Sequence, residues 1–171
     1  MRRYIRYTVL TNQQLERKMG LDIHIDLANR KELEEVQAKN KAISERNDKA
    51  YQEHGEKAQY EQVIELNPKN SFYFRKFNAL VEWVANNVGN VENCEPVELT
   101  RTHIELLQNT LNNLTPENCR LKFPTCSGFF FGSQEYDRWY WEDVESAKEM
   151  CAEILETADW EQDVVKFLIW Y

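Results

Sequence analysis

The chain has 171 residues, 42% of them hydrophobic and 12% aromatic, which is enough apolar material to bury the core of one domain. Its net charge of −8 excludes sequence-independent binding of a phosphate backbone, because an acidic surface repels a polyanion, and nucleic acid is therefore not the expected partner. No apolar run approaches the roughly 20 residues of a membrane helix and no secretory signal follows the basic start, so we expect a cytoplasmic protein that does not span a membrane.

The N-terminal part of the chain divides into a basic extension and a strand. Residues 1–18 are predicted to precede the domain, which we place at residues 19–171, and the first twenty residues hold five basic side chains against one acidic. Residues 21–27 then alternate apolar with polar or charged side chains, which is the period of a half-buried strand. The apolar side chains that should face the core are Leu21, Ile23, Ile25 and Leu27.

Residues 28–66 are predicted to form a projecting polar helical arm. This part of the chain is rich in Glu, Lys, Gln and Ala, and its only apolar stripe consists of Val36, Ile43 and Ala50. A helix with such a thin stripe would be largely solvated. Pro68 should mark the end of the arm, because a proline pushes the residue before it out of helical geometry.

Two helices are predicted in the middle of the chain. Ser71 is a suitable N-cap for the first and Gly89 a suitable stop; this helix is apolar on two sides, which is typical of a central helix. Thr100 is a suitable N-cap for the second, and Pro116 lies just beyond its end. The apolar residues at helical spacing are Phe74, Phe77, Val81, Val84 and Val88 in the first helix and Ile104, Leu107, Leu111 and Leu114 in the second.

The C-terminal part is predicted to contain two extended segments, a helix and a strand. Residues 121–124 and 128–132 are interpreted as extended segments punctuated by turns, because glycine and proline interrupt helical geometry there, and a short strand is expected at residues 129–131. Residues 136–158 carry apolar side chains spaced by three and four, which is typical of a helix packed on a core. Residues 164–171 are β-branched and aromatic and should pair with the first strand. The sequence thus predicts an α+β fold, a predominantly helical single domain with a small sheet formed by the N- and C-terminal strands.

Few reactive side chains stand in a pattern that implies chemistry. Asp22, His24 and Asp26 share one face of the first strand, but a metal would need a fourth ligand from elsewhere, so a solvated strand face is favoured. Cys126 has no histidine signature that would generate a thiolate, and the four cysteines form neither a zinc-type pair nor a disulfide framework. A phosphate-binding glycine loop and a serine nucleophile elbow are also missing from the sequence. We therefore expect no metal and no cofactor, and no catalytic residue is recognisable.

Aromatic and acidic side chains give the strongest indication of a binding surface. Trp139 and Trp141 fall off the apolar stripe of the last helix, and large exposed aromatics are typical anchors of binding sites. Arg75 could meet a carboxylate or stack on a ring. The last helix is also acidic, which either solvates its outer face or imitates a phosphate backbone for a nucleic-acid-binding protein. Its acidic residues are Glu142, Asp143, Glu145, Glu149, Glu153 and Glu156.

Several short motifs of the chain are similar to those of a known family. They are Met19-Gly20-Leu21-Asp22, Phe74-Arg75-Lys76-Phe77-Asn78, Asn93-Cys94, and Ser127-Gly128-Phe129-Phe130-Phe131-Gly132-Ser133 followed by Tyr136-Asp137 and Tyr140. Together they resemble an uncharacterised family of small phage and prophage proteins, over most of residues 19–158 apart from the arm. Some members carry a phosphoglycerate kinase label. The present sequence does not support that activity, because it is too short for a two-domain kinase and lacks a nucleotide loop.

The resemblance implies a set of site residues. Members often begin at the equivalent of Met19, which is a second reason to interpret residues 1–18 as an extension, and they carry aromatic residues in place of His24 and Asp26, which weakens a metal site further. If the residues shared by this family mark a site, the candidates here are Asp22, Arg75, Asn78, Ser127, Ser133, Tyr136 and Asp137, and the exposed aromatic Trp139 is added to them.

Three functions are compatible with these patterns. The leading hypothesis is a non-enzymatic accessory protein of a phage or prophage that binds a protein of the host or phage machinery through its aromatic and acidic surface. The alternative is a binding protein, or a small enzyme, for a small anionic, nucleotide-like ligand surrounded by Arg75 and the loop at residues 127–137. A third is a self-assembling protein in which the arm supplies the interface.

Overall fold

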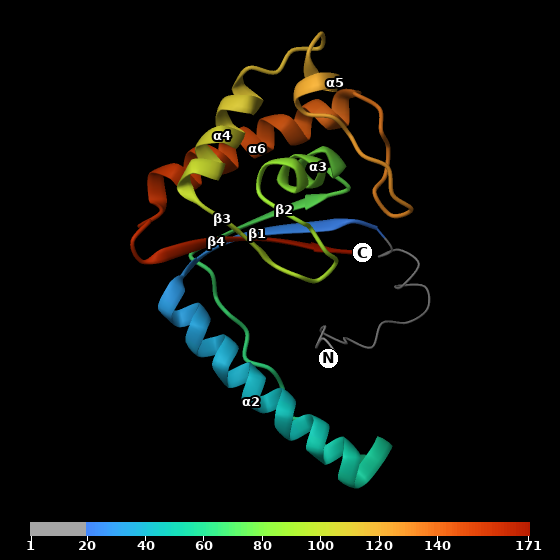
Figure 1. Ribbon diagram of the computed structural model, residues 1–171, viewed down its shortest axis with the longest axis vertical. Helices are drawn as coiled ribbons and strands as arrows, with labels where there is room; N and C mark the ends of the chain where they lie inside the picture. The colour runs from blue at the N-terminus through green and yellow to red at the C-terminus, as the bar shows by residue number, and fades with distance from the viewer. Residues whose placement is uncertain (1–19) are drawn as a thin grey trace.

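In the computed structural model, which describes residues 20–171, helices cover one face of a four-stranded antiparallel sheet (Figure 1). The strands are β1 (Asp22–Asn29), β2 (Asn70–Arg75), β3 (Val97–Leu99) and β4 (Asp163–Trp170), in the order β2-β1-β4-β3. The helices are α2 (Arg30–His54), α3 (Asn78–Asn87), α4 (Arg101–Asn112), α5 (Cys119–Lys122) and α6 (Arg138–Thr157), and a 3₁₀ turn, η1 (Gly55–Lys57), follows α2. This α+β architecture confirms the predicted fold class. The predicted basic extension, residues 1–18, lies outside the described residues.

The first and last strands form the centre of the sheet. β1 pairs with β4 in antiparallel register, from Asp22 opposite Trp170 to Asn29 opposite Asp163. The four apolar residues predicted to face the core are all fully buried, because side chains two residues apart on a strand share a face (Leu21, Ile23, Ile25, Leu27). The pairing of the two strands and the core face of β1 are therefore both as predicted.

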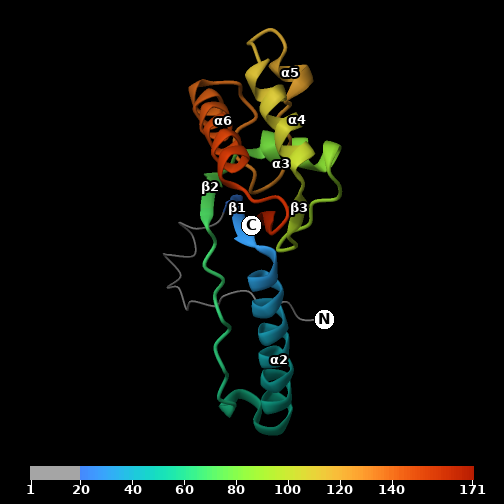
Figure 2. The same ribbon diagram turned by 90° about the vertical axis from the view of Figure 1, so that its left-hand side faces the viewer.

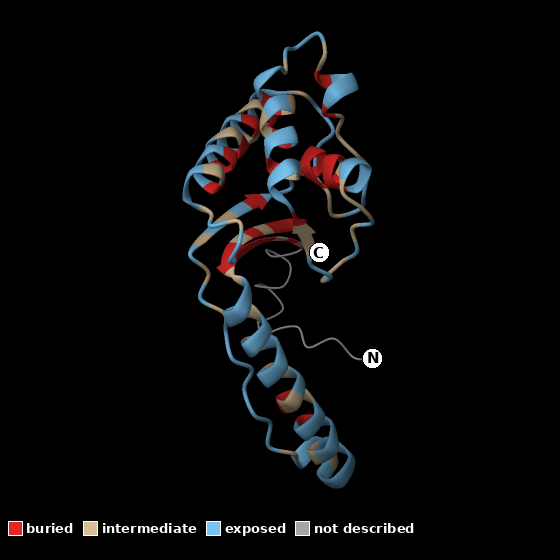
Figure 3. Ribbon diagram, turned by 60° about the vertical axis from the view of Figure 1, so that its left-hand side comes forward, coloured by how far each residue is buried: buried red, intermediate tan, exposed pale blue. Residues whose placement is uncertain are grey.

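Helices α3, α4 and α6 pack on one face of this sheet, and the buried residues lie between the two layers (Figure 3). α3 buries six of its ten residues, as expected for a helix that is apolar on two sides. α4 begins at the predicted cap: the hydroxyl of Thr100 accepts the backbone N–H of His103, and the His103 ring accepts the backbone N–H of Thr100. No helix among residues 20–171 combines the length and the apolar character needed to cross a bilayer.

The predicted helix start at Ser71 is wrong, because this part of the chain is the edge strand β2. Two periods coincide in the sequence: Phe74 and Phe77 are three residues apart, as on a helix, but residues 70–75 also alternate between more and less buried positions, as on a strand. The sheet decides between them, since β1 supplies a complete ladder of backbone hydrogen bonds to β2. Phe74 and Phe77 still touch, with ring centroids 5.5 Å apart, across a tight corner between β2 and α3.

The extended segments predicted between α4 and α6 are also wrong. Residues 119–122 form the single helical turn α5, and the aromatic run that starts at Phe129 forms a turn instead of a strand. In that turn the backbone N–H of Phe131 donates to the carbonyl of Gly128 at 3.1 Å. Among residues 20–171, none of the four strands pairs with this run, and one backbone bond, from the N–H of Leu21 to the carbonyl of Phe130 at 2.9 Å, does not make a ladder.

The predicted arm exists, but only its first part is helical. α2 ends at His54, and after the η1 turn the chain runs back beside α2 as an extended segment, residues 58–69, here called the return segment (Figure 2). The thin apolar stripe of α2 faces the return segment: Ile43 is buried, and Val36 and Ala50 are half-buried. Most of the rest of the arm is exposed, as the polar composition predicts, but Asn47 is buried (Figure 3).

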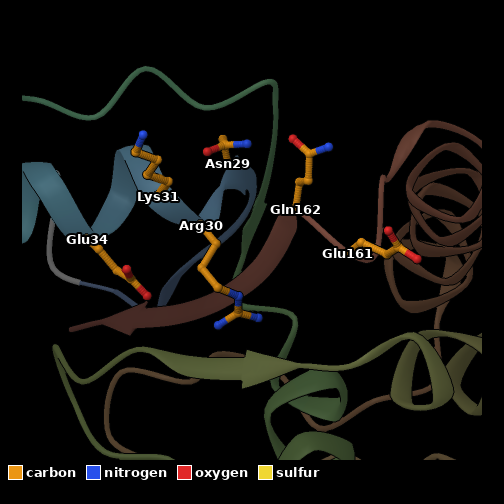
Figure 4. Close-up of a pocket in the computed structure, with 6 residues that line it drawn as sticks. All are labelled: Asn29, Arg30, Lys31, Glu34, Glu161 and Gln162. Carbon is orange, nitrogen blue, oxygen red and sulfur yellow. The ribbon is translucent and has the colours of Figure 1, made fainter.

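Ion pairs fix the base of the arm to the sheet. The guanidinium of Arg30 donates to Glu98 on β3 at 2.6 Å. The ammonium of Lys69 lies 2.7 Å and 2.8 Å from the two carboxylate oxygens of Asp163, which is fully buried. Beside this junction is an open hollow with a balanced charge, lined by Asn29, Arg30, Lys31, Glu34, Glu161 and Gln162 (Figure 4). Because its arginine is already paired with Glu98, we assign no ligand to this hollow.

Two asparagines of α2 hold the return segment in place. Asn47 uses both atoms of its amide on Glu61, donating to the carbonyl at 2.9 Å and accepting from the N–H at 2.8 Å. Asn40 does the same with Ile64, at 2.8 Å and 2.7 Å. The two asparagines are seven residues apart on the helix, a rise of about 10.5 Å, and their partners Glu61 and Ile64 are three residues apart on an extended segment, a span of about 10 Å, so the two spacings match.

We expect Asn47→Ala to open the return segment locally and leave the sheet folded. Asn47 is 3% exposed, and the substitution leaves two backbone groups of Glu61 without their partners, which costs about 1 to 3 kcal/mol. Native-state hydrogen exchange should show faster exchange at the Glu61 amide and unchanged exchange in β1. The matched control Asn86→Ala removes an exposed amide that donates to Glu82 one turn earlier in α3, and should leave both rates unchanged. Equal protection of Glu61 in the two variants would contradict this role.

Candidate functional site

The structure brings most of the predicted site residues to one hollow. This hollow lies between the β2–α3 corner, the loop that precedes α6, and the first turns of α6. Five of the eight candidates line it: Arg75, Asn78, Ser133, Asp137 and Trp139. Among the remaining three, Asp22 contacts Arg75 and Tyr136 contacts Thr125 of the hollow wall, whereas Ser127 does not line it. Four further polar residues line the hollow: Lys76, Thr125, Glu135 and Asp143. Sequence reasoning named Asp143 only as one of the acidic residues of the last helix and assigned none of the four to this site.

Asn78 is the buried link that shapes the hollow. Its amide nitrogen donates to the carbonyls of Phe131 and Ser133, both at 2.9 Å, and its amide oxygen accepts the backbone N–H of Cys126 at 3.2 Å. The side chain is 2% exposed. Asn78 therefore positions the loop that precedes α6, and its amide has no free group left for a ligand.

The two glycines of the Ser-Gly-Phe-Phe-Phe-Gly-Ser run lie where the backbone comes too close to other side chains to leave room for a Cβ atom. A Cβ atom on Gly128 would lie 2.6 Å from the ring of Phe131, and one on Gly132 would lie 2.9 Å from the Cβ of Lys76. Gly132 also has a φ of 85°, which side chains rarely adopt. Lys76 itself has a φ of 61°, so the corner between β2 and α3 is strained. Of this motif, Ser133 lines the hollow, and the two glycines let the run turn back on Phe131 and pack against Lys76.

Asp22 is paired inside the protein, so the predicted solvated face of β1 is wrong at this residue. The carboxylate is 7% exposed and accepts hydrogen bonds from the hydroxyl of Tyr73 at 2.5 Å and from Arg75 at 3.0 Å. Burial, and then the hydrogen bond to Asp22, raise the pKa of Tyr73. The other two polar residues of this face also have partners: Asp26 accepts a hydrogen bond from the hydroxyl of Ser71, and the His24 ring lies 5.2 Å, centroid to centroid, from the Tyr73 ring, tilted by 51°.

Asp137 and Tyr136 hold the start of α6. The carboxylate of Asp137 accepts the backbone N–H groups of Trp139 and Tyr140, at 3.0 Å and 3.2 Å, and so caps the helix. The hydroxyl of Tyr136 accepts the backbone N–H of Thr125 at 3.1 Å, and the guanidinium of Arg120 lies over its ring. Both residues are therefore structural, and they fix the direction in which the first turn of α6 presents its outer side chains.

Trp139 is the exposed aromatic of this site. Its side chain is 69% exposed, whereas Trp141, the other tryptophan predicted to lie off the apolar stripe, is half-buried against the core. The guanidinium of Arg138 lies 5.8 Å from the centre of a Trp139 ring. Because Asp137 caps the same helical turn, Trp139 is held at the rim of the hollow by a rigid element, which is the usual setting of a binding anchor.

Three carboxylates give the hollow an acidic wall. Glu135 and Asp137 precede α6 and Asp143 follows one and a half turns into it. Burial, followed by the neighbouring charges of Glu142 and Asp137, raises the pKa of Asp143 to about 6. A raised carboxyl pKa means that the surroundings destabilise the charged form. At neutral pH a nearby positive charge would offset this effect, so this side of the hollow favours positively charged groups.

We expect Asp143→Asn to stabilise the protein at pH 7.5 and not at pH 4. The pKa of Asp143 rises from 3.8 to about 6 on folding, so the folded state holds a proton that the unfolded state has released, and stability falls as the pH rises through this window. After allowance for solvent screening, the gain from removing the charge is about 1 kcal/mol. Urea unfolding at the two pH values measures it; a gain of equal size at pH 4 would contradict the assignment.

Cysteine and metal chemistry find no support in the geometry. Burial, and then the nearby Glu82, raise the pKa of Cys126 to about 11, which opposes formation of the thiolate that a nucleophile requires. Its thiol donates to the carbonyl of Asn78 at 3.3 Å. Among residues 20–171, no three His, Cys, Asp or Glu side chains lie close enough together to hold a metal ion.

Comparisons of the chain with models of protein families, with curated proteins and with solved structures gave no match.

Proposed function

We propose that this protein is a non-enzymatic binding protein that docks a partner protein at the hollow beside α6, with Trp139 as the anchor. The observation that carries the proposal is a large aromatic side chain, 69% exposed, on a capped helical turn at the rim of a shaped hollow. Transfer of an aromatic side chain from water into an interface is favourable. Because tryptophan has few rotatable bonds, a partner that covers it gains this binding free energy with little loss of rotamer freedom.

Charge indicates the chemistry of the partner. The acidic wall of the hollow continues along the outer face of α6, where five glutamates are exposed: Glu142, Glu145, Glu149, Glu153 and Glu156. Basic side chains on this face are confined to Arg138 and the half-buried Lys148, and these pair with Glu142 and Glu145. The proposed partner is therefore a protein with a basic segment, for which opposite charge would speed association. A nucleic-acid-binding protein of this kind would meet carboxylates where it normally meets phosphates.

The biological setting belongs to the same proposal. The resemblance of the Ser127–Ser133 run and its companion motifs to small phage and prophage proteins supports an accessory role in which the partner is a protein of the host or phage machinery. Such a protein would act in the bacterial cytoplasm.

A pull-down with matched tryptophan and leucine variants tests the docking site. Immobilised wild-type protein should retain a basic protein from a bacterial lysate at low salt, and Trp139→Ala should weaken that binding at least tenfold, because a buried aromatic anchor contributes about 2 kcal/mol or more. Leu121→Ala is the control, since Leu121 is 84% exposed on α5 and does not line the hollow. A partner retained equally by both variants, or no partner at all, would contradict the proposal.

A small anionic ligand in the same hollow is the second candidate function. Arg75 and Lys76 line the hollow and favour it. However, Arg75 is already paired with Asp22, and three carboxylates face the same space, so an anion would be repelled. A thermal-shift screen with nucleotides and phosphorylated metabolites separates the two: a rise of several degrees that Lys76→Ala abolishes would favour the ligand, and a flat screen favours the protein partner.

A further inference from the structure

Asp143 is a half-buried carboxylate without a counter-charge. It lines the hollow from α6, and within residues 20–171 its side chain takes part in no hydrogen bond or ion pair. Burial, and then the charges of Glu142 and Asp137, raise its pKa, and no described cation acts in the opposite direction. The folded protein therefore keeps a negative charge at this point that its own described residues do not compensate.

The other charged groups that face Asp143 do not neutralise it. Arg75, across the hollow, is already paired with a carboxylate of β1. The Cε atom of Lys76 lies 3.0 Å from the place that a Cβ on Gly20 would take, so its ammonium is held close to the start of β1. Glu135, in the loop before α6, adds a further negative charge. A cation from outside the protein would therefore meet an unpaired carboxylate in this hollow.

The size of the hollow limits what it holds. Its volume is about 120 Å³, whereas sites for small-molecule ligands typically measure roughly 300–1,000 Å³. A cavity of roughly 150 Å³ admits a benzene ring with its six heavy atoms, so the hollow has room for about five. The outer four heavy atoms of a lysine side chain fit this space. An arginine side chain has two more, and a nucleotide is far too large.

Trp139 supplies a second wall that attracts a cation. It stands four residues before Asp143 on α6, so the two side chains are neighbours on the same side of the helix, and both line the hollow. The face of an indole ring carries partial negative charge and attracts an ammonium group. Arg138, whose guanidinium lies 5.8 Å from the centre of a Trp139 ring, pairs with Glu142 and does not line the hollow.

We propose that the hollow takes the side chain of one lysine of the basic partner, with its ammonium on Asp143 and its methylenes along the ring of Trp139. This inference rests on the proposed function, because it names the group that the docked partner inserts. Only a charged Asp143 binds the ammonium, so the lysine competes with a proton. Because the pKa of Asp143 is about 6, the affinity for lysine should fall about tenfold between pH 7.5 and pH 5.

Titration with Nα-acetyl-lysine amide, followed by the indole N–H signal of Trp139 in nitrogen-15 NMR spectra, tests the site without any partner protein. We expect a dissociation constant on the order of 5 mM at pH 7.5 and constant ionic strength, because one ion pair and one ring contact bind weakly. Asp143→Asn should weaken binding at least fivefold and remove its pH dependence. This variant is expected to be at least as stable as the wild type at pH 7.5, so lost binding would not reflect lost folding.

Matched controls isolate the charge and the shape of the probe. Glu105→Gln removes the same charge from an exposed position of α4 that does not line the hollow, and should bind the lysine probe as the wild type does. The Nε-acetylated form of the probe keeps the chain without the charge and should not bind. Nα-acetyl-arginine amide, which carries the charge on a larger group, should bind at least threefold more weakly than the lysine probe.

The outcomes separate this site from the docking proposal. A wild-type protein that does not bind the lysine probe, or that binds it as well after Asp143→Asn, would overturn the lysine site. If the pull-down still retained a partner that depends on Trp139, the docking proposal would stand without the lysine. Lysine binding that follows the predicted pH dependence, in a protein that retains no partner, would support the site and overturn the docking proposal alone.

Discussion

Phe77→Ala should lower the free energy of unfolding by about 4 kcal/mol, the largest loss expected from any single substitution around the hollow. The Phe77 ring is 2% exposed and lies 5.5 Å, 5.7 Å and 6.4 Å, centroid to centroid, from the rings of Phe74, Phe123 and Tyr140. These neighbours come from β2, from the end of α5 and from α6, so the cavity left behind cannot collapse without moving three parts of the core. Urea unfolding followed by circular dichroism measures the loss.

The same change at Phe129 is the matched control for that experiment. Phe129 is 94% exposed at the tip of the turn before α6, so Phe129→Ala removes the same atoms from a position that buries almost nothing. We expect a change within about 0.5 kcal/mol. Similar losses for the two variants would mean that the aromatic cluster around Phe77 does not hold the hollow together.

Asn78→Ala is expected to cost about 3 kcal/mol and to abolish partner binding. The substitution leaves two carbonyls and one N–H of the loop that precedes α6 without hydrogen-bond partners. A buried polar group without a partner costs about 1 to 3 kcal/mol. Because the same bonds shape the hollow, binding should fall further than the loss of stability alone explains. Urea unfolding gives the first quantity, and titration with the purified partner at a temperature where the variant is folded gives the second.

Asn78→Asp sharpens the test, because it keeps the size of the side chain and changes only its hydrogen bonding. The new carboxylate oxygen faces the carbonyls of Phe131 and Ser133, so the charged form is repelled and the folded state raises the carboxyl pKa. This variant should be at least as unstable as Asn78→Ala at pH 7.5 and should recover as the pH falls, when protonation restores a donor. Asn87→Ala, at an exposed helix position, serves as the control with little effect. A stability of Asn78→Asp that does not depend on pH would contradict the role given to the amide.

Periodicity predicted the elements that have one apolar face. The alternation at residues 21–27 and the three-four spacing in α4 and α6 correspond to the buried residues of the structure. An element that buries one face must place its apolar residues at the period of that face, so the sequence pattern and the burial agree. Periodicity failed where a helical and a strand period overlap, as at Phe74 and Phe77, or where β-prone side chains have no strand to pair with, as at Phe129. In these places the choice depends on which hydrogen-bonding partners lie nearby, and a single segment carries no information about them.

The sequence predicted which residues lie at the candidate site better than it predicted what each of them does. Resemblance and exposure led to five residues that line the hollow, yet the structure uses Asn78 and Asp137 to hold the backbone and Asp22 to pair with Arg75. Lys76 stands beside Arg75 in a quoted motif, and Asp143 belongs to the acidic set of the last helix, but neither was assigned to this site. The raised pKa of Asp143 depends on burial by distant parts of the chain, which no local pattern encodes.

By itself, the sequence determined the α+β class, the core face of β1, the N-cap of α4 and the exposure of Trp139, because each follows from local spacing or from hydrophobic alternation. It also indicated the pairing of β1 with β4, from the β-prone composition of the last residues. Only the tertiary structure decided that Ser71–Arg75 is a strand, that the arm folds back on two asparagines, and that Arg75, Asn78, Ser133, Asp137 and Trp139 meet at one hollow. These features depend on contacts between residues far apart in the chain, and the free energy of such contacts is set by the partner as much as by the residue.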